Sequence, residues 1–392
     1  MQKNNTMVRK HIILSILVGF FLLSSCSKKS DWVDNSIDIA AYQLDMMANE
    51  ISDSAKLPRS IKNGKIRLEN IYDWTSGFFP GSLWYMYEFT KDEKFKNEAL
   101  KYTHLLYDLK DYTGTHDLGF MVYCSYGNAF RITNDSSYVP VMVQTADNLI
   151  SRFNKNTQTI RSWDFGEWQF PVIIDNMMNL ELLFWASEYT HNPKYKDVAI
   201  RHANTSMENH FRNDFSSYHV INYDTISGNV LSKGTFQGYS DESAWARGQA
   251  WGLYGYIVCY RYTHDEKYLE FAENIASFIM KNVKTDDLIP YWDYNAPDIP
   301  NAPHDASAAA VTASALLELS EIVNNDNQYY KYAETILKNL SSKAYLAQKG
   351  ENKGFILMHS VGHLPANSEI DTPLNYADYY YLEALKRYKA LN

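Results

Sequence analysis

The stretch Thr263-His264-Asp265-Glu266-Lys267-Tyr268 joins two apolar segments of helical periodicity, and its pattern occurs five times along the chain. Every copy has Asp or Asn at its third position and an aromatic residue three positions later. The other copies lie at residues 90–95, 133–138, 190–195 and 324–329. The Asp or Asn can cap the second helix while the aromatic ring packs on the first. The repeat therefore predicts a chain built from helical hairpins.

Hydrophobic periodicity, followed outward from these turns, predicts twelve helices. They cover residues 34–54, 76–89, 93–109, 118–132, 136–153, 174–189, 193–211, 242–262, 266–281, 305–323, 327–346 and 373–389. Short turns alternate with long connections at 55–75, 110–117, 154–173, 212–241, 282–304 and 347–372. This alternation favours an all-α toroid of six hairpins, an (α/α)6 barrel, with the long loops at one end. An open helical array is the alternative, and the uneven repeat spacing argues against it.

The N-terminus is typical of a secreted lipoprotein. Basic residues precede an apolar run at 12–23, which is short for a transmembrane helix and is followed by Ser24-Ser25-Cys26. The small residues before Cys26 resemble a bacterial lipobox, which implies cleavage there and lipid attachment to Cys26. A plain secretory signal with an incidental cysteine is the alternative.

The predicted organisation is a signal peptide at 1–25, a lipidated tether at 26–33 and one catalytic domain at 34–392. No acidic cluster follows Cys26, which favours a periplasm-facing protein anchored to a membrane of the bacterial envelope.

Composition limits the classes of function. With 392 residues, 45% of them hydrophobic, the chain can bury a large core. Removal of the signal, which carries three basic residues, takes the net charge from −9 to about −12, which argues against nucleic acid as a partner. Cys124 and Cys259 lie in apolar stretches and are expected to be buried free thiols. No Cys-x-x-Cys or His-Glu-x-x-His motif is present, so neither a metal nor a cofactor is predicted.

Two carboxylates are the best candidates for chemistry. Asp117, preceded by His116, and Asp175 each stand before a predicted helix at the end of a long connection. Paired carboxylates can divide acid and base roles. Helix capping is an equally good interpretation of each residue. His304-Asp305 has a similar pattern, but the small residues that follow indicate close packing, so Asp305 is interpreted as mainly structural.

The run at 235–251 combines amides, carboxylates, Arg247 and two Trp residues at a helix entrance. Sugars bind to flat aromatic faces and to forked hydrogen-bond donors, and Arg247 and Trp251 would share one helix face. The alternative is a capped amphipathic helix with Trp245 and Trp251 in the core.

Several longer motifs resemble the unsaturated glucuronyl hydrolases, glycoside hydrolase family 88, over about residues 34–390. The motifs are Asp73-Trp74-Thr75-Ser76-Gly77-Phe78-Phe79-Pro80-Gly81, His116-Asp117-Leu118-Gly119-Phe120, Ile174-Asp175-Asn176-Met177-Met178-Asn179, Ser217-Tyr218-His219-Val220, the run at 235–251, and Tyr376-Ala377-Asp378-Tyr379-Tyr380. The resemblance implies an (α/α)6 barrel that removes 4,5-unsaturated glucuronic acid from the non-reducing end of oligosaccharides produced by polysaccharide lyases.

The resemblance also implies hydration of a vinyl ether, with Asp175 protonating C4 and then helping water to add at C5. Asp117 matches the second essential carboxylate. Residues matching the family's substrate-binding positions are Trp74, His116, Trp163, His219, Thr235, Gln237, Arg247 and Trp251. Arg247 is expected near the uronate carboxylate, and Trp74 and Trp251 are expected to stack on the sugar.

The expected partner is an unsaturated uronic-acid oligosaccharide, with glycosaminoglycan fragments favoured. Two other functions remain open at this point: an unsaturated rhamnogalacturonyl hydrolase acting on pectin fragments, and a non-catalytic glycan-binding lipoprotein.

Overall fold

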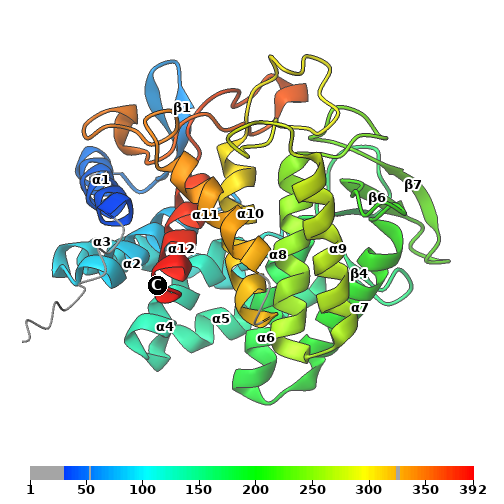
Figure 1. Cartoon of the computed structure of the whole chain (residues 1–392). Helices are drawn as coiled ribbons and strands as arrows, with labels where there is room; N and C mark the ends of the chain where they lie inside the picture. Colours follow the sequence, from blue (N-terminus) through cyan, green and yellow to red (C-terminus); the bar gives the residue numbers. More distant parts are fainter. Residues whose placement is uncertain (1–30, 53, 324–326) are drawn as a thin grey trace, which may run out of the picture.

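The computed structural model describes residues 31–52, 54–323 and 327–392. An inner ring of helices surrounds the central axis of the molecule (Figure 1). The ring consists of α2 (Phe78–Thr90), the π-helix η2 (Gly119–Gly127) continued by α4 (Asn128–Thr133), α6 (Asn176–Thr190), α8 (Ala246–Thr263), α10 (Ala306–Ile322) and α12 (Asn375–Ala390). Each member contacts the next, and α12 contacts α2, so the ring is closed. All six inner members begin at the same end of the barrel, where the long connections lie.

Outer helices pack against the inner ring. They are α1 (Asp31–Glu50), α3 (Glu93–Leu105), α5 (Val139–Ser151), α7 (Pro193–Asn209), α9 (Glu266–Asn282) and α11 (Asn327–Leu340). Short 3-10 turns lie at Tyr107–Asp111, Ser136–Tyr138, Asn352–Gly354 and Leu364–Ala366. The predicted (α/α)6 barrel is confirmed, with the helices in the predicted order. No described helix combines the length and apolar character needed to cross a membrane.

The repeated turns cap the outer helices as their sequence predicts. In four copies the Asp or Asn side chain accepts a hydrogen bond from the backbone N–H two residues later, at Asp92, Asp135, Asn192 and Asp265. The aromatic residue of each of these copies is buried. In the fifth copy, residues 324–326 lie outside the described residues, and the aromatic Tyr329 is buried.

Short β-structure occurs inside the long connections, which were predicted as loops. The strands are β1 (Leu57–Lys62), β2 (Lys65–Glu69), β3 (Phe153–Asn154), β4 (Thr159–Ile160), β5 (Pro171–Ile173), β6 (Val220–Tyr223) and β7 (Val230–Gly234). β1–β2 and β3–β4 are antiparallel pairs, and β5–β6–β7 form an antiparallel sheet in which Val172 faces Ile221. The β1–β2 turn, Asn63-Gly64, has positive φ at both residues, as a two-residue hairpin requires.

A layer of buried aromatic rings fills the barrel axis. The Phe78 ring packs against Trp74 and Phe120, with centroids 5.8 and 5.3 Å away. Trp251, which is fully buried, packs against Phe120 and Tyr380, with centroids 5.2 and 5.4 Å away. This aromatic layer separates the two ends of the barrel.

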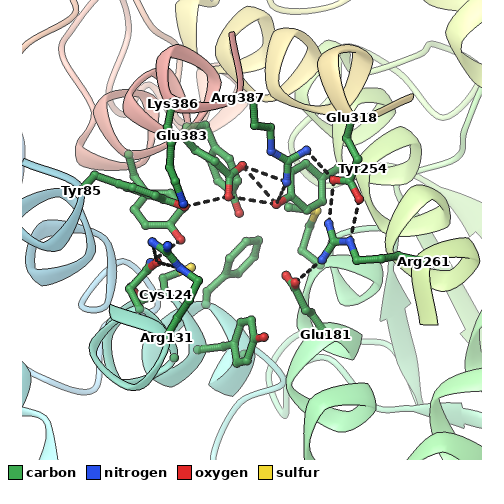
Figure 2. A pocket seen from close by; sticks show the side chains of 18 of the residues that line it. Tyr85, Cys124, Arg131, Glu181, Tyr254, Arg261, Glu318, Glu383, Lys386 and Arg387 are labelled. Carbon is green, nitrogen blue, oxygen red and sulfur yellow. Dashed lines mark hydrogen bonds and ion pairs between the residues drawn. The ribbon is translucent and has the colours of Figure 1, made fainter. Parts of the chain in front are cut away.

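The end opposite the long connections holds a network of ion pairs around a cavity of about 390 Å³ (Figure 2). Arg261 binds Glu181 and Glu318, and Arg387 binds Glu318 and lies 3.7 Å from Glu383. Burial would raise the pKa of Glu318, but the charges of Arg387 and Arg261 lower it to about 2. These interacting charges join the last turns of α8 and α12 to α6 and α10, so the network has a structural role.

Candidate active site

A cavity of about 610 Å³ opens among the long connections. It contains both carboxylates that the sequence singled out, Asp117 and Asp175. Its other lining residues are Arg59, Tyr72, Asp73, Trp74, Tyr112, Gly114, Thr115, His116, Ser162, Trp163, Asp164, Phe165, Ile173, Phe236, Gln237, Gly362, His363 and Tyr376. Segments from six different connections or helix starts therefore meet at one site, as expected for loops carried by a rigid scaffold.

Asp175 precedes the first residue of α6, but its side chain forms no capping hydrogen bond. The residue is only 7% exposed, and its Oδ2 atom has no hydrogen-bond partner. A buried carboxylate oxygen without a partner is unfavourable unless it holds a proton or binds a ligand. Of the two interpretations of Asp175, the capping one is therefore not supported by the geometry.

His219 faces this free oxygen, with its Nε2 atom 3.5 Å from Asp175 Oδ2. Its other ring nitrogen, Nδ1, accepts hydrogen bonds from the backbone N–H groups of Phe236 and Gln237, both at 3.1 Å. A nitrogen that accepts hydrogen bonds carries no proton, so the hydrogen of the ring is on Nε2. His219 is thus a neutral imidazole that presents an N–H group to Asp175.

Asp117 belongs to a second hydrogen-bonded group. Its Oδ2 accepts from the Thr115 hydroxyl at 2.9 Å, and its Oδ1 lies 3.2 Å from His116 Nε2. His116 Nδ1 contacts the Asn176 side-chain oxygen, and Asn176 donates from its amide nitrogen to the carbonyl of Ile160 at 2.7 Å. This chain of contacts orients His116 and connects Asp117 to the residue that follows Asp175.

The two carboxylates precede neighbouring inner helices, η2 and α6, whose backbones approach each other closely. A Cβ atom on Gly119 would lie 2.6 Å from the Asn179 Cα atom, so only glycine allows η2 to pack this closely on α6. The Asn179 side chain also accepts a hydrogen bond from the Phe120 N–H at 2.8 Å. The first turn of η2, just after Asp117, is therefore fixed to α6.

Two pairs of aromatic rings line the cavity. The half-buried Trp74 ring packs against Tyr376, with centroids 4.9 Å apart. Trp163 and the exposed Phe165 stack at 5.0 Å with an angle of 14° between their planes. Flat apolar faces of this kind bind the CH face of a sugar ring. The predicted positions of Trp74 and Trp163 in the pocket are thus consistent with the cavity lining.

The connection at 347–372 closes another side of the cavity through Gly362 and His363. Gln237 donates to the Gly362 carbonyl at 3.1 Å, and the His363 ring contacts the Phe236 carbonyl through Nε2 at 2.8 Å. Burial lowers the pKa of His363, which favours its neutral form.

The same connection is attached to α12 by Asp378, whose carboxyl group accepts hydrogen bonds from the backbone N–H groups of Ile356 and Leu357. Burial raises the pKa of Asp378 to about 8.

Arg247 and Trp251 do not line the cavity, which differs from the expected direct contact with substrate. Arg247 is 1% exposed and donates to Asp305 at 3.0 Å and to the carbonyls of Val361 and Gly362. Arg247 therefore supports the lining residue Gly362 from the protein interior. Asp305 caps α10, as the structural interpretation predicted. Trp251 belongs to the aromatic layer, because an inner helix turns this face toward the barrel axis.

Thr235 and His219 are also absent from the lining. The Thr235 hydroxyl accepts the Gly238 N–H at 2.7 Å, so it shapes the turn that carries Gln237. Both residues support the cavity rather than forming its surface.

Arg59 is a lining residue that the sequence motifs missed. It lies in β1, and it forms salt bridges with Glu369 and Asp73, both at 2.8 Å. An Asn-Gly pair between two stretches of strand-like residues was the available signal for this hairpin.

Comparison with known proteins identifies the family. Residues 45–390 match the model of Glycosyl Hydrolase Family 88. The chain belongs to this family. The fold agrees with this membership, and this family member is an enzyme, a glycoside hydrolase of the unsaturated glucuronyl hydrolase group.

Individual relatives are similar over most of the chain. The unsaturated glucuronyl hydrolase of Formosa agariphila is 51% identical over 319 residues, 80% of each chain. A crystal structure of an unsaturated glucuronyl hydrolase specific for heparin is 55% identical, covers 92% of this chain and 98% of its own, and has a TM-score of 0.90. A variant of the Streptococcus agalactiae enzyme in complex with dGlcA-GalNAc6S is 31% identical, with a TM-score of 0.77 and coverage of 91% and 92%.

No described group of three or more His, Cys, Asp or Glu residues is arranged to hold a metal ion. The chemistry that the site can perform with its own groups is proton transfer by carboxylates.

Proposed function

We propose that this enzyme removes 4,5-unsaturated glucuronic acid from the non-reducing end of glycosaminoglycan oligosaccharides by hydrating the vinyl ether of the sugar. The observation that carries the proposal is Asp175, a buried carboxylate with an unpaired oxygen in a cavity that also holds Asp117. A carboxyl group in such surroundings is suited to proton transfer to carbon.

In the proposed reaction, protonated Asp175 gives its proton to C4, and positive charge develops at C5 and the ring oxygen. Water then adds its oxygen to C5 and returns a proton to Asp175. The resulting hemiketal opens, and the partner sugar is released from C1. No covalent bond forms between enzyme and substrate, so Asp175 ends the cycle protonated, as it began.

Neighbouring groups support these steps. The His219 ring lies 3.5 Å from Asp175 without a hydrogen bond between them, and it places no full positive charge beside the carboxyl group, so it does not stabilise the anion as an imidazolium would. Asp117, oriented by Thr115 and His116, can accept hydrogen bonds from sugar hydroxyls. Trp74 and Trp163, which both line the cavity, each offer a flat face on which a sugar ring can stack.

We propose heparin-derived fragments as the preferred substrates. The supporting observation is that the solved structure with 55% identity is described as specific for heparin, whereas the Streptococcus agalactiae relative, an unsaturated chondroitin disaccharide hydrolase, is 33% identical.

The test follows the ultraviolet absorbance of the conjugated C4=C5 bond, with unsaturated disaccharides from heparin, chondroitin, hyaluronan and rhamnogalacturonan as substrates. Loss of absorbance that is fastest with heparin disaccharides is expected. Turnover of the rhamnogalacturonan disaccharide alone would instead identify an enzyme that acts on pectin fragments. Turnover of none of the four disaccharides would contradict the proposal.

We further propose that Cys26 carries a lipid anchor that tethers the enzyme to the bacterial envelope. Cys26 lies outside the described residues, and the support is the sequence around it. In cells labelled with radioactive palmitate, the wild-type protein should take up label and partition into Triton X-114. A Cys26→Ala variant should do neither, and unlabelled wild-type protein would contradict the anchor.

A further inference from the structure

The cavity has an unusual balance of charge for an enzyme of anionic sugars. Four carboxylates line it, namely Asp73, Asp117, Asp164 and Asp175, whereas Arg59 is the single Lys or Arg side chain in its lining. An anionic substrate group must find a cation here to offset the loss of water and the nearby negative charge.

Arg247, which the resemblance places near the uronate, is already occupied. Its two terminal nitrogens donate to Asp305, Ser307 and the carbonyls of Val361 and Gly362. Its Nε and one of the two N–H bonds of its Nη2 have no partner, but the side chain is 1% exposed and does not line the cavity. A substrate anion in the cavity could reach this guanidinium only if the residues that cover it moved.

Arg59 differs from Arg247 in position, because its side chain lies at the cavity surface. Its Nε and Nη2 donate to Glu369 at 2.8 and 2.9 Å, and its Nη1 donates to Asp73 at 2.8 Å. A guanidinium group has five N–H bonds, so three are engaged and two remain. The side chain is 15% exposed, into the cavity that it lines.

The surrounding groups hold Arg59 in place. Glu369 is itself fixed by Ser60 at 2.8 Å and by Arg67 at 3.0 Å, and the Arg59 guanidinium carbon lies 5.9 Å from the centre of the Trp74 ring. Burial would raise the pKa of Glu369, but the hydrogen bonds and charge of Arg59 lower it, so this partner stays ionised. A preoriented guanidinium beside a stacking Trp suits an oxyanion attached to a sugar that lies on that ring.

We propose that Arg59 is a specificity-determining residue that binds an oxyanion of the substrate, either the uronate carboxylate or a sulfate ester, through its two free N–H bonds. The inference rests on the proposed function, since it requires an anionic sugar in this cavity. It assigns to the β1–β2 hairpin a role in substrate recognition.

The experiment compares Arg59→Gln with Arg67→Gln. Both variants remove one arginine from Glu369, but Arg67 does not line the cavity, so Arg67→Gln controls for loss of the supporting contacts. Steady-state kinetics would use unsulfated and 6-sulfated unsaturated heparin disaccharides, and an unsulfated heparin disaccharide whose uronate is a methyl ester. Arg59→Lys, which keeps the charge, provides a second variant if Arg59→Gln fails to fold.

We expect Arg59→Gln to raise KM about tenfold to a hundredfold, as for a lost hydrogen bond to a charged group, with a much smaller change in kcat. Arg67→Gln should leave KM within about twofold, since the half-buried Arg67 contacts Glu369 but does not line the cavity. An equal rise for both heparin disaccharides, with no rise for the methyl ester, identifies the carboxylate as the ligand. A rise confined to the sulfated substrate identifies the sulfate.

Equal effects of Arg59→Gln and Arg67→Gln on KM, or no effect of Arg59→Gln on any substrate that the wild-type enzyme turns over, would overturn the inference. Absence of wild-type turnover on every substrate would instead overturn the proposed function, so the two failures are distinguishable.

Discussion

At the scale of single residues, Asp175 is the group on which turnover should depend most strongly. Asp175→Asn removes the transferable proton but keeps the shape, so kcat should fall by about 10²–10⁴-fold, the usual contribution of a general acid. The melting temperature should stay close to that of the wild type, because Oδ2 makes no hydrogen bond in the folded protein. An absorbance assay stopped at fixed times measures kcat, and calorimetry measures the melting temperature.

The matched control is Asp197→Asn, which changes the same side chain on the surface of α7, where Asp197 pairs with Arg201. It should keep wild-type kinetics. Full activity of Asp175→Asn would remove this residue from the proton-transfer step.

A substitution of Arg247 tests whether this residue stabilises the segment that lines the cavity. Arg247→Met leaves Asp305 buried without its cation, which costs about 3–5 kcal/mol for a buried ion pair. We therefore expect a large fall in the urea midpoint of unfolding. Arg247→Met/Asp305→Asn should recover part of it. An unchanged midpoint with a raised KM would instead show that Arg247 acts by binding substrate.

At the scale of elements, α12 holds the connection at 347–372 through a carboxylate that should make stability depend on pH. The folded pKa of Asp378, about 8, lies above its ordinary value of 3.8, because burial disfavours the charged form. The folded protein therefore keeps a proton that the unfolded chain releases between these pH values. This group should lower stability as pH rises from about 4 to 8.

Urea midpoints at pH 5 and pH 8.5 measure the effect. The wild-type midpoint should decrease more between these pH values than that of Asp378→Asn, which cannot titrate. Equal decreases in the two proteins would contradict the assignment to Asp378.

The elements also show what sequence could predict. The helical hairpins were predictable because capping at residues such as Asp265 and periodic burial are local properties. Asp117 and Asp175 were predictable as site residues because they end long connections. Whether Arg247 lines the cavity or supports it depends on the distant residues Val361 and Gly362, and no local pattern contains that information. Arg59 was missed because its position at the cavity is set by Glu369, which lies 310 residues away.

At the scale of the whole molecule, the aromatic layer lies between the ion-pair network at one end of the barrel and the cavity at the other. A change in the network should therefore lower stability without changing substrate binding. Arg387→Met removes a cation that binds Glu318 and donates to the Ser314 carbonyl at 2.9 Å at the far end of the barrel. We expect a loss of about 3–5 kcal/mol in the free energy of unfolding, because Glu318 and Arg387 are largely buried. KM should change by less than about twofold. A larger change in KM would show that the two ends are coupled.

The common direction of the six inner helices has an electrical consequence. Each helix carries a dipole with its positive end at the N-terminus, so six positive ends converge on the mouth of the cavity. Arg131, Arg261 and Arg387 lie in last turns at the other end, where they offset the negative ends. These positive ends offset part of the negative charge of the four carboxylates in the cavity lining, so they lower the electrostatic cost of bringing an anionic sugar to this place on an acidic protein.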